Sequence, residues 1–281
     1  MSGFSPEWLA LREPADARAR ATALEVALAS AMAARGPTPG TTWVAVDLAS
    51  GTGANVRHLA PRLPGPQRWR LLDADPRLLE RARERCTGLR AADGSPVEIE
   101  SRTLDLARAS LSEACDGASL VTASALLDLV SEAWLQELAA ACAGAGAVTL
   151  LALDYDGRRE CLPGDAGDAQ ALAAFDQHQR RDKGFGPALG AQATEAAATA
   201  FAARGFHVRR APSDWWLGPE EAPLQAALLR GWAEAASDAW PEARAAIETW
   251  QGRRAAHLAA RVSRLHVGHQ DLLAVPPRPP G

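Results

Sequence analysis

Two glycines and a neighbouring acid make the segment 43–57 the part of this chain best suited to hold a small molecule. Gly51 and Gly53 follow an apolar run that contains Asp47, and they precede a segment expected to be helical, 52–63. Glycines let the backbone turn tightly and pass close to a ligand. A helix that begins at such a turn directs its N–H groups and positive dipole end toward the ligand. The expected occupant is therefore an anionic or carboxylate-bearing small molecule.

A second acid lies at the spacing expected of a ribose-binding residue. Asp73 follows the next apolar run, 69–72, about 20 residues after Gly51, and this separation places an acid at the tip of the adjacent strand, facing ribose hydroxyls. Asp75 and Pro76 come directly afterwards and are typical of a helix N-cap and a first helical residue. Asp75 is therefore predicted to be a cap rather than a ligand-binding residue.

The residue order around the turn, apolar–Asp–apolar–Ala–Ser–Gly–x–Gly, resembles motif I of class I S-adenosylmethionine-dependent methyltransferases of the small-molecule type. A dinucleotide-binding fold would carry a third glycine where this chain has Val56. The resemblance implies that S-adenosyl-L-methionine is the cofactor, that Asp47 helps to hold its methionine amino group and that the glycines line the methionine and ribose. Ala49 departs from the family, which more often has a glycine at that position.

The resemblance covers residues 40–156 and implies a cofactor site at the ends of successive strands. Asp105 ends an expected third strand, 97–104, where the family commonly places the acid that contacts the adenine amino group. A fourth strand, 120–124, runs toward Asp128 at the motif IV position, beside the transferable methyl. The implied cofactor-binding residues are Asp47, Ala49, Ser50, Gly51, Thr52, Gly53, Asn55, Asp73, Ala74, Asp105, Leu106 and Ser124.

Alternating strands and helices are expected to position these residues. Apolar runs predict strands at 43–48, 69–72, 97–104, 120–124, 147–153, 206–211 and 264–275, with helical segments between most of them. With the resemblance, this order predicts an α/β, Rossmann-like, seven-stranded and mostly parallel sheet, of strand order 3-2-1-4-5-7-6 with the seventh strand antiparallel. N-terminal helices and helical insertions are expected to lie over the active site.

The expected organisation has a lid, a methyltransferase domain and a cap. Residues 1–36 form an N-terminal helical lid, 37–275 the methyltransferase domain and 276–281 a tail, while insertions at about 156–190 and 213–260 form a substrate cap. In the lid, Ser5 and Pro6 start a helix, Pro14 restarts it after a kink, and Gly36-Pro37 stops it. Arg12 is a further candidate cofactor-binding residue, because it sits at the predicted kink, although a solvated position on the helix surface is an equal alternative.

The insertion after the fifth strand is longer than the minimal fold needs, and long connections at this end of a parallel sheet usually carry function. His178 is the candidate catalytic base, since an ordinary histidine pKa suits proton transfer at neutral pH. The alternative is that it pairs with Asp182, one helical turn on. Lys183 is the only lysine of the chain and Tyr155 is the only tyrosine. Each is retained either because a functional site needs it or by chance. The candidate substrate-binding residues are Tyr155, Arg181, Asp182, Lys183 and Trp215.

Composition narrows the class of protein. A net charge of -4 argues against a broad nucleic-acid footprint. The four cysteines lack C-x-x-C spacing, so neither a zinc site nor a disulfide framework is predicted, and no metal is expected. No segment is apolar enough to span a membrane and the N-terminus lacks a signal-peptide pattern. A cytoplasmic monomer or homodimer is expected, without nucleic-acid or membrane partners.

The sequence thus predicts methyl transfer from S-adenosyl-L-methionine to an oxygen or nitrogen of a small-molecule acceptor by in-line displacement. The Asn-Pro-Pro-Tyr-type loop of amino-directed DNA methyltransferases and the Pro-Cys nucleophile of cytosine C5 enzymes are missing. Asp154 and Asp156 lack the asparagine that accompanies the metal-binding acids of catechol-type enzymes. Two alternatives stay open: a protein or RNA methyltransferase that docks its partner on the insertion, and a non-catalytic cofactor-binding module on the same fold.

Overall fold

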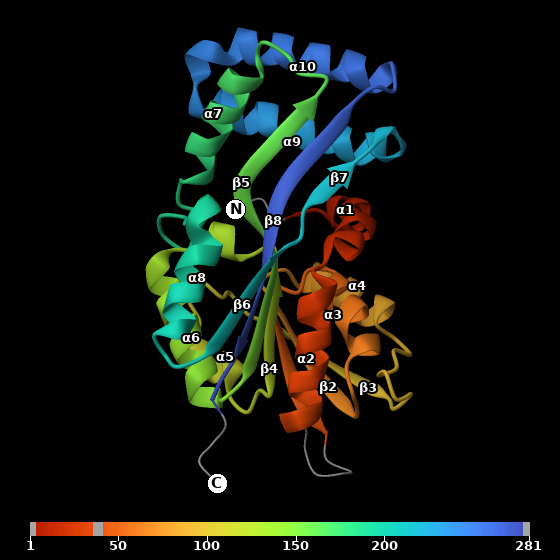
Figure 1. Cartoon of the computed structure of the whole chain (residues 1–281), viewed down its shortest axis with the longest axis vertical. Coiled ribbons are helices and arrows are strands. Elements are labelled where there is room, and N and C mark those ends of the chain that lie inside the picture. Colours follow the sequence, from red (N-terminus) through yellow and green to blue (C-terminus); the bar gives the residue numbers. More distant parts are fainter. Residues whose placement is uncertain (1–3, 36–41, 278–281) are drawn as a thin grey trace.

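The computed structural model describes residues 4–35 and 42–277 and contains one eight-stranded sheet (Figure 1). Its strands lie in the order β3-β2-β1-β4-β5-β8-β6, and β7 pairs with β8. β1 to β5 run parallel, whereas β8 runs antiparallel to its neighbours β5 and β6. The strand bounds are β1 Trp43–Leu48, β2 Gln67–Asp73, β3 Val97–Thr103, β4 Leu120–Ser124, β5 Val148–Leu162, β6 His207–Pro212, β7 Trp215–Leu217 and β8 Arg264–Val275.

The predicted α/β fold and strand order are confirmed, because β8 takes the place expected of an antiparallel seventh strand. The strand number differs by one. β7 is a short strand that pairs with the first residues of β8, and its sequence, Trp-Trp-Leu, is too short to show the alternation that identifies a strand.

Helices cover both faces of the sheet. α2 (Thr22–Arg35), α3 (Ala54–Leu59) and α4 (Pro76–Arg85) pack on one face, and α5 (Leu111–Cys115), α6 (Glu132–Ala145) and α8 (Ala193–Ala202) pack on the other. Coverage on both faces explains why the central strands are apolar on both sides. Within the described ranges, no helix is both long and apolar enough to cross a membrane.

The N-terminal helix α1 (Pro6–Ala19) begins as predicted, with the Ser5 hydroxyl accepting a hydrogen bond from the Trp8 amide at 3.2 Å. The predicted restart at Pro14 is wrong, because the helix continues through this proline. A proline removes a single N–H donor, and the Arg12–Asp16 ion pair at 2.8 Å spans the same turn of the helix. The predicted stop at Gly36-Pro37 lies outside the described residues.

A second layer of structure extends beyond the carboxyl ends of β1 to β4. β5 continues past its predicted end at residue 153, so that the start of the expected insertion is strand rather than loop, and this extension pairs with β8. α7 (Asp168–Gln179), α9 (Ala222–Ala239) and α10 (Arg244–Ala259) pack on it, together with Ala15 of α1. Figure 1 shows these helices gathered at one end of the molecule. We refer to the β5–β8 extension, β7, α7, α9 and α10 as the cap.

Candidate functional site

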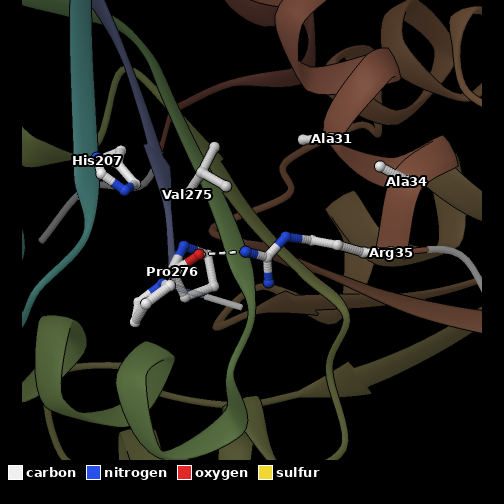
Figure 2. Close-up of a pocket in the computed structure, with 7 residues that line it drawn as sticks. Ala31, Ala34, Arg35, His207, Val275 and Pro276 are labelled. Atoms are coloured by element: carbon white, nitrogen blue, oxygen red, sulfur yellow. Dashed lines mark hydrogen bonds between the residues drawn. The ribbon is translucent and has the colours of Figure 1, made fainter. Parts of the chain in front are cut away.

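Two pockets lie at opposite ends of the sheet. The pocket drawn in Figure 2 measures about 360 Å³ and lies where β6 begins and β8 ends, lined by Ala31, Ala34, Arg35, His207, Val275, Pro276 and Pro277. Ligands of open α/β sheets bind at the other end, beyond the carboxyl ends of the parallel strands. A second cavity of about 220 Å³ is found there, against α1, α3, β4 and β5, and this end carries the candidate site.

Strained backbone marks the same rim. Ala49 follows β1, Ala125 follows β4 and Leu153 lies within β5, with φ angles of 51°, 53° and 58°. A side chain in this left-handed region costs roughly 1–2 kcal/mol, and β1, β4 and β5 are neighbours in the sheet. Residues held in such conformations cluster at functional sites. Three of them on adjacent strands support placing a site at this rim.

The glycine turn has the predicted shape, although its helix is shorter than expected. Gly51 and Gly53 have φ angles of 52° and 76°, so both use the freedom that only glycine has at no steric cost. Because Gly53 is left-handed, α3 begins only at Ala54. The Ser50 hydroxyl donates to the Asp47 carbonyl oxygen at 2.7 Å and accepts from the Leu72 amide at 3.1 Å, which fixes the turn between β1 and β2.

Asp47 is buried under the turn with one oxygen unused. Its Oδ1 accepts from Asn55 Nδ2 at 2.7 Å, and the same Nδ2 donates to the Thr122 hydroxyl at 3.0 Å. Asp47 Oδ2 and Asn55 Oδ1 are buried and have no hydrogen-bond partner in the part of the chain that the structure describes. Burial raises the pKa of Asp47 to about 7. Two free buried acceptors are suited to a ligand that donates hydrogen bonds, such as an ammonium group.

Asp73 lies at the rim of β2 as predicted, and its carboxylate braces the turn. Its Oδ2 accepts from the Gly51 amide at 2.8 Å and its Oδ1 accepts from the Asp75 amide at 2.9 Å. Each carboxylate oxygen keeps a second lone pair for a hydroxyl donor. Asp75 caps α4 through the Arg77 amide at 2.8 Å, which confirms its predicted role.

α1 lies directly over the turn. A methyl group on Gly51 would stand 3.0 Å from Leu9 Cδ1, so the Leu9 side chain closes the space above this glycine. One turn further on, Glu13 binds Arg57 of α3 at 2.5 Å and Arg85 of α4 at 2.8 Å. α1 is thus fastened to the two helices that flank the turn.

The 220 Å³ cavity is lined by Glu13, Asp16, Ala17, Arg20, Ala54, Asn55, Arg57, His58, Arg62, Ser124 and Leu153. The side chain of Arg20 is 3 % exposed and lies 3.6 Å from Glu25 and 4.0 Å from Asp271. Its Nε and Nη2 nevertheless find no hydrogen-bond partner within the described residues. Unmet guanidinium donors favour a carboxylate. No local sequence signal identifies Arg20, because one of the two acids beside it, Asp271, comes from the distant strand β8.

Other predicted cofactor residues surround this centre. Thr52 is buried, and its carbonyl oxygen accepts from Arg57 at 2.5 Å. Ala74 is exposed between the two acids of the β2 rim. Asp105 is half-exposed beyond β3 and accepts from the Ala107 amide at 3.1 Å, while Leu106 is buried and its carbonyl oxygen accepts from Trp134 at 2.8 Å. These residues extend the site along the rim from β1 toward β3.

Arg12 points away from the turn. It pairs with Asp16, and its guanidinium carbon lies 5.0 Å from the ring centroid of Trp215, a buried residue of the cap. The predicted cofactor residue Arg12 therefore faces the cap side of the site, whereas Arg20 of the same N-terminal region lines the cavity.

The predicted residues of the insertion form a polar group at the end of α7. Lys183 Nζ lies 3.1 Å from His178 Nδ1, and His178 Nε2 lies 3.5 Å from Asp238. Arg181 also pairs with Asp238. Burial and the positive charge of Lys183 lower the pKa of His178. The pairing of His178 with Asp182 does not form, because α7 ends at Gln179 and Asp182 instead accepts from the Gly184 amide at 2.6 Å.

A second set of polar residues lies between the cap and the rim, and sequence reasoning identified only part of it. Asp128 is half-buried, and burial raises its pKa to about 6 although Arg12 and Lys183 act in the opposite direction. Asp154 is buried, accepts from the Leu127 amide at 3.0 Å and has its pKa raised by burial and by Asp128. The carboxyl groups of Asp128, which follows β4, and of Asp154, which lies within β5, therefore influence each other electrostatically.

Comparison with known proteins finds distant structural likeness only. No family model and no curated protein matches the chain. A cyclopropane synthase from Mycobacterium tuberculosis is similar at a TM-score of 0.49 and 15% identity, over 96% of this chain and 94% of the other. A geranyl diphosphate C-methyltransferase from Streptomyces coelicolor has a TM-score of 0.44 and 13% identity, over 90% and 81%. A phosphoethanolamine N-methyltransferase from Haemonchus contortus has a TM-score of 0.46 and 14% identity, over 99% of this chain and 59% of the other. These likenesses are too distant to assign an activity.

Proposed function

We propose that this chain is an S-adenosyl-L-methionine-dependent methyltransferase that methylates an oxygen or nitrogen of a small-molecule acceptor. The observation that carries the proposal is the pair of unmet polar groups beside the glycine turn: buried acceptors on Asp47 and Asn55, and buried donors on Arg20. The amino-acid end of the cofactor has an ammonium and a carboxylate, which match these acceptors and donors.

The remaining cofactor contacts follow the rim. Asp73 lies beyond the turn, with lone pairs left for ribose hydroxyls. Asp105 and Leu106 follow β3 at the adenine end, as the motif resemblance implies. Ser124 lines the cavity at the end of β4, which supports an orientation with the sulfonium end of the cofactor toward β4.

The bound cofactor supplies an activated methyl group, so the chain's main task is alignment. Oriented proximity can lower a barrier by roughly 7–11 kcal/mol. A base is needed where the acceptor must lose a proton, and two residues are candidates. His178 is the weaker one, because Nδ1 of the neutral ring faces the Lys183 ammonium and Nε2 then carries the proton and faces Asp238. Asp128 follows β4 directly, and its raised pKa of about 6 leaves it ionised at neutral pH and basic enough to take a proton.

The test is calorimetric titration with S-adenosylhomocysteine, which keeps the ammonium, carboxylate, ribose and adenine of the cofactor. We expect micromolar binding to the wild type and at least a tenfold loss in Asp73→Ala, roughly the effect of one charged hydrogen-bonding group. Asp116→Ala, which removes an exposed acid distant from the turn, is the matched control and should bind normally. Absence of binding to the wild type would overturn the proposal.

Catalysis is tested separately from binding. Formation of S-adenosylhomocysteine from S-adenosyl-L-methionine, measured with a panel of small amines, alcohols and phenols, should depend on the acceptor. A chain that binds the cofactor but transfers no methyl group to small molecules would favour the non-catalytic module, or the enzyme acting on a macromolecule.

A further inference from the structure

The inner side of the cap contains a group of buried polar atoms without partners. Within the described residues, no hydrogen bond satisfies Asp154 Oδ2, Tyr155 Oη, Arg159 Nε and Nη1, Ser213 Oγ, Trp215 Nε1 or His269 Nδ1. Native proteins satisfy nearly all such groups, and each exception calls for an explanation. Seven in one region indicate that something else completes them.

These atoms belong to one contact network. The ring of His269 lies 5.0 Å from Trp215 and 6.5 Å from Tyr155, between centroids. The guanidinium carbon of Arg159 lies 5.4 Å from the Tyr155 ring. The Ser213 amide donates to the His269 carbonyl oxygen at 2.9 Å. Side chains from β5, β7 and β8 therefore meet at one place, where Asp154 directly precedes Tyr155 in β5 and the charge of Asp128 acts on Tyr155.

Arg159 is the most constrained member. Its side chain is 4 % exposed, and Nη2 donates to Asp176 at 2.7 Å and to the Leu172 carbonyl oxygen at 3.2 Å. The guanidinium also lies 4.8 Å from the ring of Phe175 and 5.9 Å from that of Trp232. Aromatic rings and one carboxylate thus fix its orientation, while the N–H groups on Nε and Nη1 have no partner within the described residues. A fixed guanidinium with free donors is a ready-made partner for an anionic oxygen group.

The buried polar atoms near Arg159 and Trp215 differ in hydrogen-bonding capacity from those near Asp154 and Asp128. Nε and Nη1 of Arg159 and Nε1 of Trp215 can only donate, so they require acceptor atoms. On the other side, burial and next the charge of Asp128 raise the pKa of Asp154 well above its usual range, so the Asp154 carboxyl can hold a proton and donate, and Asp128 is the carboxylate that accepts. The occupant therefore presents oxygens toward Arg159 and Trp215 and a donating group toward Asp128.

We propose that the methyl acceptor is a small carboxylic acid, whose carboxylate is bound by Arg159 while its amine or hydroxyl donates to Asp128. This rests on the proposed function. A carboxylate suits the site better than a doubly charged phosphate, because Arg159 already shares its single charge with Asp176. In the transfer, the acceptor's lone pair bonds to the methyl carbon, the carbon–sulfur bond breaks with its electron pair left on sulfur, and the acceptor proton passes to Asp128.

The proposed position is closed in this structure. The unmet atoms have no contact with solvent, Phe175 of α7 and Trp232 of α9 lie against Arg159, and the guanidinium of Arg12 lies over Trp215 from α1. Entry of the acceptor therefore requires movement of the helices around it.

The experiment compares acceptors that differ only in the carboxylate. S-Adenosylhomocysteine formation is measured with 4-aminobenzoate and aniline, 4-hydroxybenzoate and phenol, and β-alanine and ethylamine. We expect turnover of carboxylated members only. Arg159→Met should raise KM for them by about tenfold or more while kcat changes little, because a charged hydrogen-bonding partner is lost away from the reacting atoms. Arg158→Met is the matched control, since this neighbouring arginine is half-exposed and binds Asp156 and Asp214.

Each other outcome overturns the inference. Equal turnover of the neutral members would show that no carboxylate is bound, and an unchanged KM in Arg159→Met would remove Arg159 from the site. If S-adenosylhomocysteine binds but no carboxylated member is bound or methylated, the acceptor class is wrong while the proposed function stands; if it does not bind, both fail. Should Arg159→Met not fold, Trp215→Phe removes one unmet donor and should raise KM several-fold.

Discussion

Replacing Asp47 by asparagine should make the unliganded protein more stable above neutral pH while abolishing cofactor binding. The wild-type carboxyl is 1 % exposed, and one of its oxygens has no partner within the described residues. Asparagine has nearly the same shape and keeps an oxygen for Asn55 Nδ2, which donates to Asp47 at 2.7 Å. The substitution therefore removes the buried charge and little else.

The magnitude follows from the pKa. Burial raises the Asp47 pKa from 3.8 to about 7, so the folded state favours the protonated carboxyl. This carboxyl contributes its full share of folding stability at pH values below its pKa in the unfolded chain, and that contribution is lost as pH rises through about 7. At about 1.4 kcal/mol for each unit of pKa difference, the loss reaches roughly 4 kcal/mol. We expect Asp47→Asn to gain about 2–4 kcal/mol over the wild type at pH 8 and almost nothing at pH 4.

Urea unfolding of the wild type and of Asp47→Asn at pH 4, 6 and 8 measures this difference in unfolding free energy. The contributions of all other titrating groups are the same in both proteins and cancel in the difference. Asp116→Asn, which changes an exposed acid, should match the wild type at every pH. A gain for Asp47→Asn that is the same at pH 4 and pH 8 would refute the buried-charge argument. Unchanged affinity of Asp47→Asn for S-adenosylhomocysteine would refute the assignment of Asp47 to the ammonium.

Two further substitutions test the turn and the helix over it. Gly51→Ala should lower the free energy of unfolding by about 1–2 kcal/mol and weaken S-adenosylhomocysteine binding, because the φ angle of Gly51 is 52° and the new methyl meets only the flexible Leu9 at 3.0 Å. Gly53→Ala should lower it by about 3 kcal/mol or more, because its methyl would stand 2.8 Å from a buried thiol. Equal losses of the two variants in urea unfolding would contradict this reasoning. Glu13→Gln should speed amide exchange in α1 about fivefold, because about 1 kcal/mol of ion pairing with two arginines is lost. The control Glu248→Gln, which changes an exposed acid of α10, should leave exchange in α1 unchanged.

The sequence predicts the rim of the sheet well because its signals are local. The turn at Gly51, the acid at Asp73 and the cap at Asp75 each depend on residues within a few positions along the chain, and the structure has all three in place. The strand order needed the motif resemblance in addition, because apolar runs identify strands without ordering them.

The cap is predicted less well because its contacts are distant in sequence. The extension of β5 exists through its pairing with β8, about a hundred residues later, and polar residues within it hide the alternation of a strand. Arg159 has the composition of a surface residue and is buried only because α7 and α9 supply the rings of Phe175 and Trp232. Nothing near it in the sequence distinguishes it from Arg158, which stays half-exposed.

One helix unites the two halves of the site. α1 places Leu9 on the glycine turn, fastens Glu13 to α3 and α4, and stacks Arg12 over Trp215 of the cap. The proposed cofactor position lies under the first of these contacts and the proposed acceptor position behind the last. A displacement of the whole helix would therefore break its contacts over both positions at once, which couples the proposed cofactor and acceptor positions through α1.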